Sequence, residues 1–164
     1  MKIIIVLQGD NFTQKIMKQA AADLRGCPEI EVEEFSCEAG GSVQYMDFGK
    51  MKTDIIILPD LHGFTQCTLT GGVAYNLVDS KFIHLLLHES LQNESFLGKQ
   101  LSISMFFYCV GENYYKHLQG NYPDLPYLKE LKGWNDGEDE AAAERNAGLV
   151  VSAVKEVIEK CHLQ

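Results

Sequence analysis

Polar side chains that can carry acid–base chemistry gather where two apolar runs of the chain end. The runs are 54–58 and 81–88. The polar residues at and beyond their ends are Asp60, His62, His88, Glu89 and Ser90. An imidazole exists in both protonation states near neutral pH, which makes His88 the candidate acid–base residue of this group.

The two apolar runs are the elements that must position these side chains. Residues 54–58 lack polar alternation, which is typical of a strand buried on both faces, and residues 81–88 repeat the pattern. The segment between them has room for one crossover helix, expected at 72–78. Ligands bind beyond the carboxyl ends of parallel strands, so the polar residues should meet at one edge of a sheet.

The remaining sequence alternates between strand and helix patterns. Further strands are expected at 2–7, 29–36 and 101–110, and helices at 12–25, 42–50, 111–119 and 141–160. The order predicts a single domain over residues 1–164 of the α/β class. Its expected architecture is a flavodoxin-like, doubly wound sheet of five parallel strands in a three-layer α/β/α arrangement.

Composition excludes several classes of function. A net charge of −9 without clustered lysine or arginine argues against nucleic-acid binding. The apolar runs are too short to span a membrane, and the start of the chain lacks the pattern of a signal peptide, so a cytoplasmic protein is expected. Five scattered cysteines without a CxxC pair indicate reduced thiols. The expected partner is a small-molecule substrate.

Four segments together resemble type II 3-dehydroquinate dehydratase. They are 7–12 (LQGDNF), 30–40 (IEVEEFSCEAG), 60–68 (DLHGFTQCT) and 88–91 (HESL). The resemblance covers about residues 1–119 and implies a flavodoxin-like fold and the elimination of water through an enolate intermediate. It also implies a homo-oligomer built from trimers. No cofactor is expected.

The resemblance also implies roles for individual residues. His88 would protonate the leaving hydroxyl group, and Asn11 would hold the intermediate. Asp60, Gln66, Glu89 and Ser90 stand at further positions of the family's site and are expected to bind substrate. His62, close to Asp60 in the sequence, is expected to join them. The family's lid arginine and tyrosine base have no counterpart, and no arginine lies between Arg25 and Arg145. A tyrosine at or after the fifth strand, foremost Tyr108, is the candidate replacement base if a neighbour lowers its pKa.

The leading interpretation is a divergent dehydratase or lyase that acts on a small polar or carboxylated substrate. A metal-dependent hydrolase is an alternative, because Asp60, His62 and His88 offer ligands that suit zinc or manganese. An FMN-binding flavodoxin-like protein is another, although Asp10 in the turn 8–13 would repel a phosphate. A binding protein that kept the fold without the chemistry is the third.

Overall fold

The structure is a computed structural model, and it describes nine parts of the chain: residues 1–7, 11–36, 54–60, 65–70, 73–77, 82–87, 105–121, 123 and 127–160. The helices are α1 (Asn11–Arg25), α2 (Glu112–Asn121) and α3 (Glu140–Lys160). The strands are β1 (Lys2–Leu7), β2 (Glu31–Ser36), β3 (Ile55–Asp60), β4 (Thr65–Thr70), β5 (Val73–Leu77), β6 (Phe82–Leu87), β7 (Met105–Cys109) and β8 (Leu128–Glu130). The helix predicted at 42–50 lies outside the described residues.

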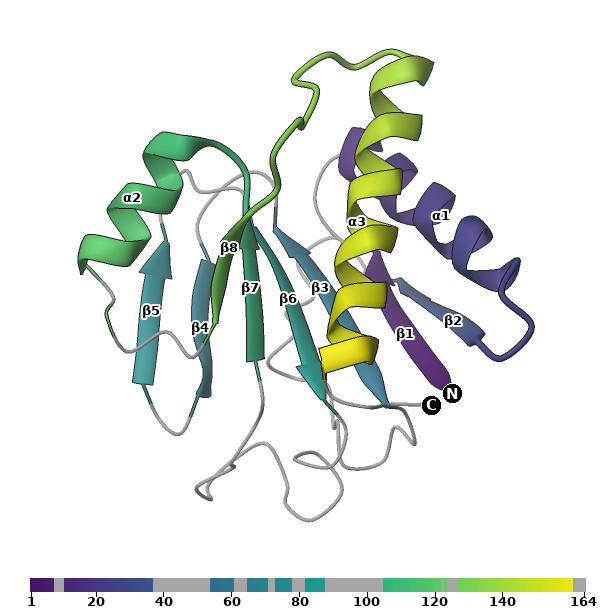
Figure 1. Ribbon diagram of the computed structural model, residues 1–164, viewed down its shortest axis with the longest axis horizontal. Coiled ribbons are helices and arrows are strands. Elements are labelled where there is room, and N and C mark those ends of the chain that lie inside the picture. Colours follow the sequence, from purple (N-terminus) through teal and green to yellow (C-terminus); the bar gives the residue numbers. More distant parts are fainter. Residues whose placement is uncertain are drawn as a thin grey trace.

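A six-stranded sheet forms the centre of this α/β protein, with strand order β2-β1-β3-β6-β7-β8 (Figure 1). β1 pairs in parallel with β2 and β3, and β7 pairs in parallel with β8. β6 lies between β3 and β7 and is antiparallel to both. The α/β class is therefore confirmed, but the described sheet is mixed and not the predicted sheet of five parallel strands.

The direction of β6 follows from the segment that precedes it. The helix predicted at 72–78 is wrong: residues 73–77 form β5, which pairs antiparallel with β4 in a separate two-stranded sheet. Valine and tyrosine in this segment favour strands over helices. A parallel neighbour of β3 would need a crossover connection, whereas an antiparallel neighbour does not. The chain accordingly enters β6 at Phe82, directly opposite Asp60.

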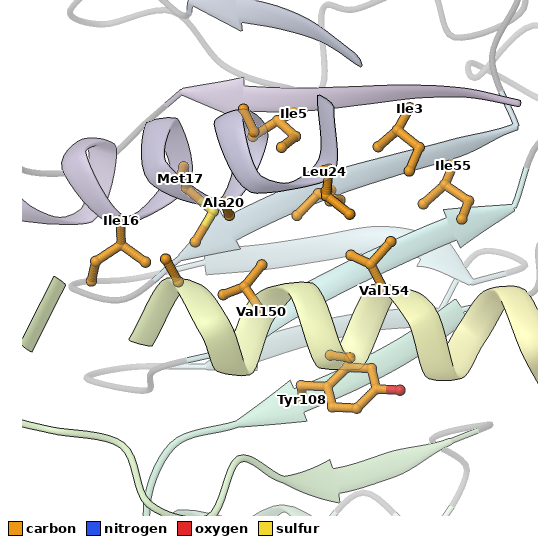
Figure 2. Close-up of a cluster of buried hydrophobic side chains, with 14 of the residues drawn as sticks. Ile3, Ile5, Ile16, Met17, Ala20, Leu24, Ile55, Tyr108, Val150 and Val154 are labelled. Carbon is orange, nitrogen blue, oxygen red and sulfur yellow. The ribbon is translucent and has the colours of Figure 1, made fainter. Parts of the chain in front are cut away.

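The main core lies between β1, α1 and α3 on one face of the sheet. Apolar residues recur along α1 at three- and four-residue spacing, as the sequence predicts. Figure 2 shows Ile16, Met17, Ala20 and Leu24 of α1 opposite Val150 and Val154 of α3, with Ile3 and Ile5 of β1 beside them. All of these side chains are fully buried. Ile4 and Val6 are buried on the other face of β1, which confirms a strand covered on both sides.

Polar contacts fix the start of α3 and the loop before it. The Asp139 side chain caps the helix by accepting a hydrogen bond from the Ala142 N–H at 2.8 Å. The buried Asn146 side chain accepts a hydrogen bond from the Asn135 N–H and donates one to the Asn135 carbonyl, each at 2.8 Å. These bonds orient the chain between β8 and α3.

None of the helices in the described ranges has the length and hydrophobicity that a membrane-spanning helix needs.

Candidate functional site

β1 and β3 together define a switch point of the sheet. β1 has β2 on one side and β3 on the other, so the chain order reverses there. Because Ile5 pairs with Ile57 in a parallel register, β1 and β3 end at the same edge of the sheet. In open α/β sheets, the carboxyl ends of the strands at such a point border the ligand crevice. Asn11 and Asp60 are the predicted site residues at this edge.

Asn11 is the first residue of α1, and its side chain is exposed. It lies on the solvent-facing stripe of the helix and lines a shallow polar hollow of about 460 Å³ with Gln14, Lys15, Lys18 and Gln19. No acidic side chain occupies the first turn of α1. The positive end of the helix dipole therefore favours an anion at this end of α1.

The end of β6 lies far from this edge. Asp60 pairs with Phe82 at the start of β6, and Leu87 at its end pairs with Ile55. The carboxyl ends of β3 and β6 are therefore at opposite edges of the sheet, roughly 17 Å apart along the strands. The prediction that the ends of these two strands lie together assumed that β3 and β6 run in parallel. The structure shows them antiparallel.

The remaining predicted site residues are divided between the second sheet and the undescribed parts of the chain. His62, His88, Glu89 and Ser90 lie outside the described residues. Gln66 belongs to β4, where its backbone pairs with that of Asn76 in the two-stranded sheet. From the predicted set, Asn11 and Asp60 are the residues that the described elements place near the same edge of the sheet.

Tyr108 lies on β7 with its ring in the core, beside α3 (Figure 2). That hydroxyl donates a long hydrogen bond, 3.4 Å, to Glu156 Oε1. Tyr127 donates a short one, 2.5 Å, to the same oxygen, and Lys129 Nζ lies 2.5 Å from Oε2. Lys160 adds its charge above the Tyr127 ring, 5.4 Å from the ring centre. One carboxylate therefore joins α3 to β7 and to the β8 region.

The electrostatics of this cluster oppose the predicted role of Tyr108 as a base. Burial, followed by the negative charge of Glu156, raises the pKa of Tyr108. Burial and the bond to Glu156 raise the pKa of Tyr127 to about 12. Burial alone would raise the pKa of Glu156, but hydrogen bonds from Lys129 and Tyr127 and the nearby lysine charges outweigh it and lower that pKa. The predicted role as a base required a neighbour that lowers the pKa of Tyr108, and burial and Glu156 instead raise it.

A cavity of about 640 Å³ lies between α2, β8 and α3. Tyr108 lines it, and charged pairs flank it: Lys129 with Glu156, and Lys116 Nζ with Glu112 Oε1 at 2.9 Å. Neither this cavity nor its carboxylate was predicted from the sequence. No local signal marks Glu156, because its partner Tyr127 is 29 residues away along the chain.

The described residues were compared with two kinds of reactive site, a metal centre and an activated cysteine. No group of three or more histidine, cysteine, aspartate or glutamate side chains among them is arranged to hold a metal ion. Two of the three residues in the hydrolase alternative, His62 and His88, lie beyond the described ranges. Cys109 is buried, and burial followed by the charge of Glu130 raises the pKa of its thiol to about 12. The thiol is therefore protonated at neutral pH.

No protein-family model matches this chain, and neither a curated protein nor a solved structure matches it. Function is therefore inferred from the residues themselves and from the geometry of the sheet.

Proposed function

We propose that this protein binds a small polar or carboxylated molecule at the switch point between β1 and β3. The observation that carries the proposal is the parallel pairing of these two neighbouring strands, which ends at one edge of the sheet. Asn11 opens α1 just beyond that edge, and Asp60 ends β3 on it.

The groups at this edge suit a ligand that has both hydroxyl and carboxylate groups. A carboxylate such as that of Asp60 can accept hydrogen bonds from hydroxyl groups, and the positive end of the α1 dipole favours a carboxylate. The Asn11 side chain offers both a donor and an acceptor. A hydroxy acid supplies partners for all three.

A divergent lyase of the type II dehydroquinase kind is the second candidate. The order of the four resembling segments supports it, as does the strand order β2-β1-β3-β6-β7, which flavodoxin-like sheets share. In this candidate His88 protonates the departing hydroxyl, backbone at Glu89 and Ser90 binds the carboxylate, and His62 and Gln66 contact substrate. This candidate also implies the family's trimer-based assembly.

The direction of β6 favours binding without this chemistry. An acid at the carboxyl end of β6 has to reach the leaving group of a ligand held beside Asp60, and β6 ends at the opposite edge. General acid catalysis requires hydrogen-bond reach between the acid and the reacting oxygen.

Calorimetric titration of the full chain with 3-dehydroquinate and a panel of small hydroxy acids tests the proposal. We expect saturable heat with at least one compound, and its loss in Asp60→Ala. Asp23→Ala is the matched control, because Asp23 is an exposed carboxylate near the other end of α1. Heat that Asp60→Ala retains in full, or a panel without saturable heat, contradicts the proposed site.

Turnover of 3-dehydroquinate separates the two candidates. Dehydration that disappears in His88→Ala supports the lyase. Binding of a hydroxy acid without turnover supports a binding protein and eliminates the family's reaction.

A further inference from the structure

The loop before α3 contains the one step of the sequence at which an aspartate or asparagine precedes a glycine, Asp136–Gly137. Both residues are exposed to water. Glycine leaves its own backbone nitrogen uncrowded by a side chain and allows the local backbone many conformations. That nitrogen can therefore approach the carboxyl group of the preceding aspartate, which makes such a step prone to spontaneous isomerisation.

The reaction at this step needs no reagent except water. The Gly137 nitrogen bonds to Cγ of Asp136, and the carboxyl group loses its hydroxyl, which leaves as water with the proton of the nitrogen. The product is a succinimide ring, and one water molecule reopens it. Opening at the backbone carbonyl leaves an isoaspartyl linkage, in which the chain runs through the side chain of residue 136. The mass is unchanged, and the backbone is longer by one methylene group.

Two asparagines hold the nitrogen that would react. The Gly137 N–H donates a hydrogen bond to the side-chain oxygen of Asn135 at 2.8 Å. Asn135 is itself fixed, because the side chain of Asn146 on α3 binds its N–H and its carbonyl, each at 2.8 Å. Asn146 is fully buried. We call these bonds from Asn146 through Asn135 to the Gly137 N–H the asparagine relay.

Glycine at position 137 is part of the same arrangement. A Cβ atom at this position would lie 3.0 Å from the side-chain oxygen of Asn135, closer than an ordinary van der Waals contact. A larger residue would therefore crowd the oxygen that accepts the hydrogen bond. The residue type that makes the step reactive is thus also the type that lets the relay form.

We propose that Asp136–Gly137 is a latent site of isoaspartate formation, which the asparagine relay keeps unreactive in the folded protein. An amide that donates a hydrogen bond has to give up that bond as its proton leaves, so the bond adds to the barrier. The relay also limits the rotation that would bring the nitrogen to the carboxyl group. The proposal concerns the loop before α3 and is independent of the ligand at the switch point.

The modification would act on the start of α3. Asp139 follows the reactive step closely and caps the helix through the Ala142 N–H, at 2.8 Å. Asn135 on the other side of the step is held by the relay. An extra methylene group between these two fixed points displaces one of them, so isomerisation would weaken the cap, the relay or both.

Incubation of the full chain at neutral pH measures the reaction. Samples are digested with an endoproteinase that cleaves before aspartate but not before isoaspartate, and the fragments are separated by mass spectrometry. Residues 131–140 as a free peptide supply the rate without the fold. We expect the protein to isomerise about tenfold or more slowly than the peptide, as the loss of one hydrogen bond at the barrier implies. Equal rates in protein and peptide overturn the proposal.

Asn135→Ala isolates the last bond of the relay. It removes the oxygen that Gly137 binds and keeps the backbone groups that Asn146 binds. Its rate should rise toward that of a peptide with the same substitution. Asp136→Glu should abolish the reaction, because its longer side chain would have to close a larger ring. A rate in Asn135→Ala equal to that of the unchanged protein contradicts the role of the relay.

Leu24→Ala is the matched control for a general loss of stability. It truncates a fully buried side chain of the core and leaves the relay intact. Denaturation verifies that it is folded under the conditions of incubation, and it should then isomerise as slowly as the unchanged protein. Equal acceleration by Leu24→Ala and Asn135→Ala would assign the protection to global folding and overturn the proposal.

Discussion

α3 packs against the rest of the protein in two places that differ in their chemistry. Against α1 it presents small and apolar side chains, including Ala147, Val150 and Val154, all fully buried. Against β7 and the β8 region it presents the carboxylate of Glu156, which receives hydrogen bonds from two tyrosines and a lysine. One helix thus makes apolar contacts with α1, and on its other side adds the directed hydrogen bonds of one carboxylate to the packing of the Tyr108 ring.

Comparing the two contacts shows which of them depends on individual atoms. Apolar burial is non-directional and is shared among many side chains, so the α1–α3 contact depends on volume. The Glu156 cluster depends on directed bonds to two oxygen atoms, and each lost acceptor leaves a donor in a partly buried place. The following substitutions compare the two contacts, beginning with the largest expected effect.

Leu24→Ala should lower the free energy of unfolding by about 2–5 kcal/mol, because Leu24 is fully buried in the contact and its truncation leaves a cavity. Chemical denaturation measures the change. Lys18→Ala on the exposed stripe of α1 is the control and should stay within about 0.5 kcal/mol. A loss from Leu24→Ala as small as that of the control would mean that α1 contributes little to the core.

Glu156→Gln should cost about 1–3 kcal/mol, because the amide keeps the size of the side chain and removes the charge that Lys129 and Tyr127 bind. Glu159→Gln, at an exposed position of the same helix, is the matched control. The lowered pKa of Glu156 sets the pH dependence: its ionised form contributes stability above the ordinary value of 4.5, and this is lost as the pH falls through the lower folded value. The difference between protein and variant should therefore shrink in acid.

Tyr127 should ionise near pH 12, later than an ordinary tyrosine with a pKa of 10. Because its folded pKa is raised, its contribution to stability is fully present below pH 10 and is lost as the pH rises toward 12. Ultraviolet titration of the protein against Tyr127→Phe isolates this hydroxyl. A difference curve centred at the ordinary tyrosine value would show that the bond to Glu156 is absent in solution.

Lys15→Met should have the smallest effect, about 0.5 kcal/mol or less. Lys15 Nζ lies 2.5 Å from Glu140 Oε1 and joins the same two helices as the apolar contact, but both side chains are well exposed. Denaturation at low and high salt measures the change, which should disappear at high salt. If high salt does not reduce the loss of stability in Lys15→Met, the lysine stabilises the protein through the packing of its methylene groups and not through its charge.

The helices that pack on the core are well predicted from sequence. α1 begins one residue before its predicted start and α3 one residue before its own, because the period of their apolar residues and the caps that precede them are local signals. β1 matches its prediction for a related reason: an apolar run indicates a buried strand without reference to its neighbours.

Features that depend on distant residues were not predictable in this way. An apolar run such as 82–87 carries no information about direction, which depends on whether a helix or a hairpin precedes it. β8 is short and carries two charged residues, so it has no strand signal of its own. For the candidate site, the apolar run 54–58 indicated a strand, which the structure has as β3, but the surroundings of Tyr108 depend on Glu156, 48 residues away.

The packing of α1 against α3 has a consequence for the order of events during synthesis. Lys15 and Glu140, which bridge these helices, are 125 residues apart. At the usual rate of translation, roughly 6–25 seconds separate the appearance of one helix from that of the other. During that interval Ile16, Met17 and Leu24 lack α3, against which they pack in the finished protein, and the nascent chain presents an apolar surface of the kind that ribosome-associated chaperones bind.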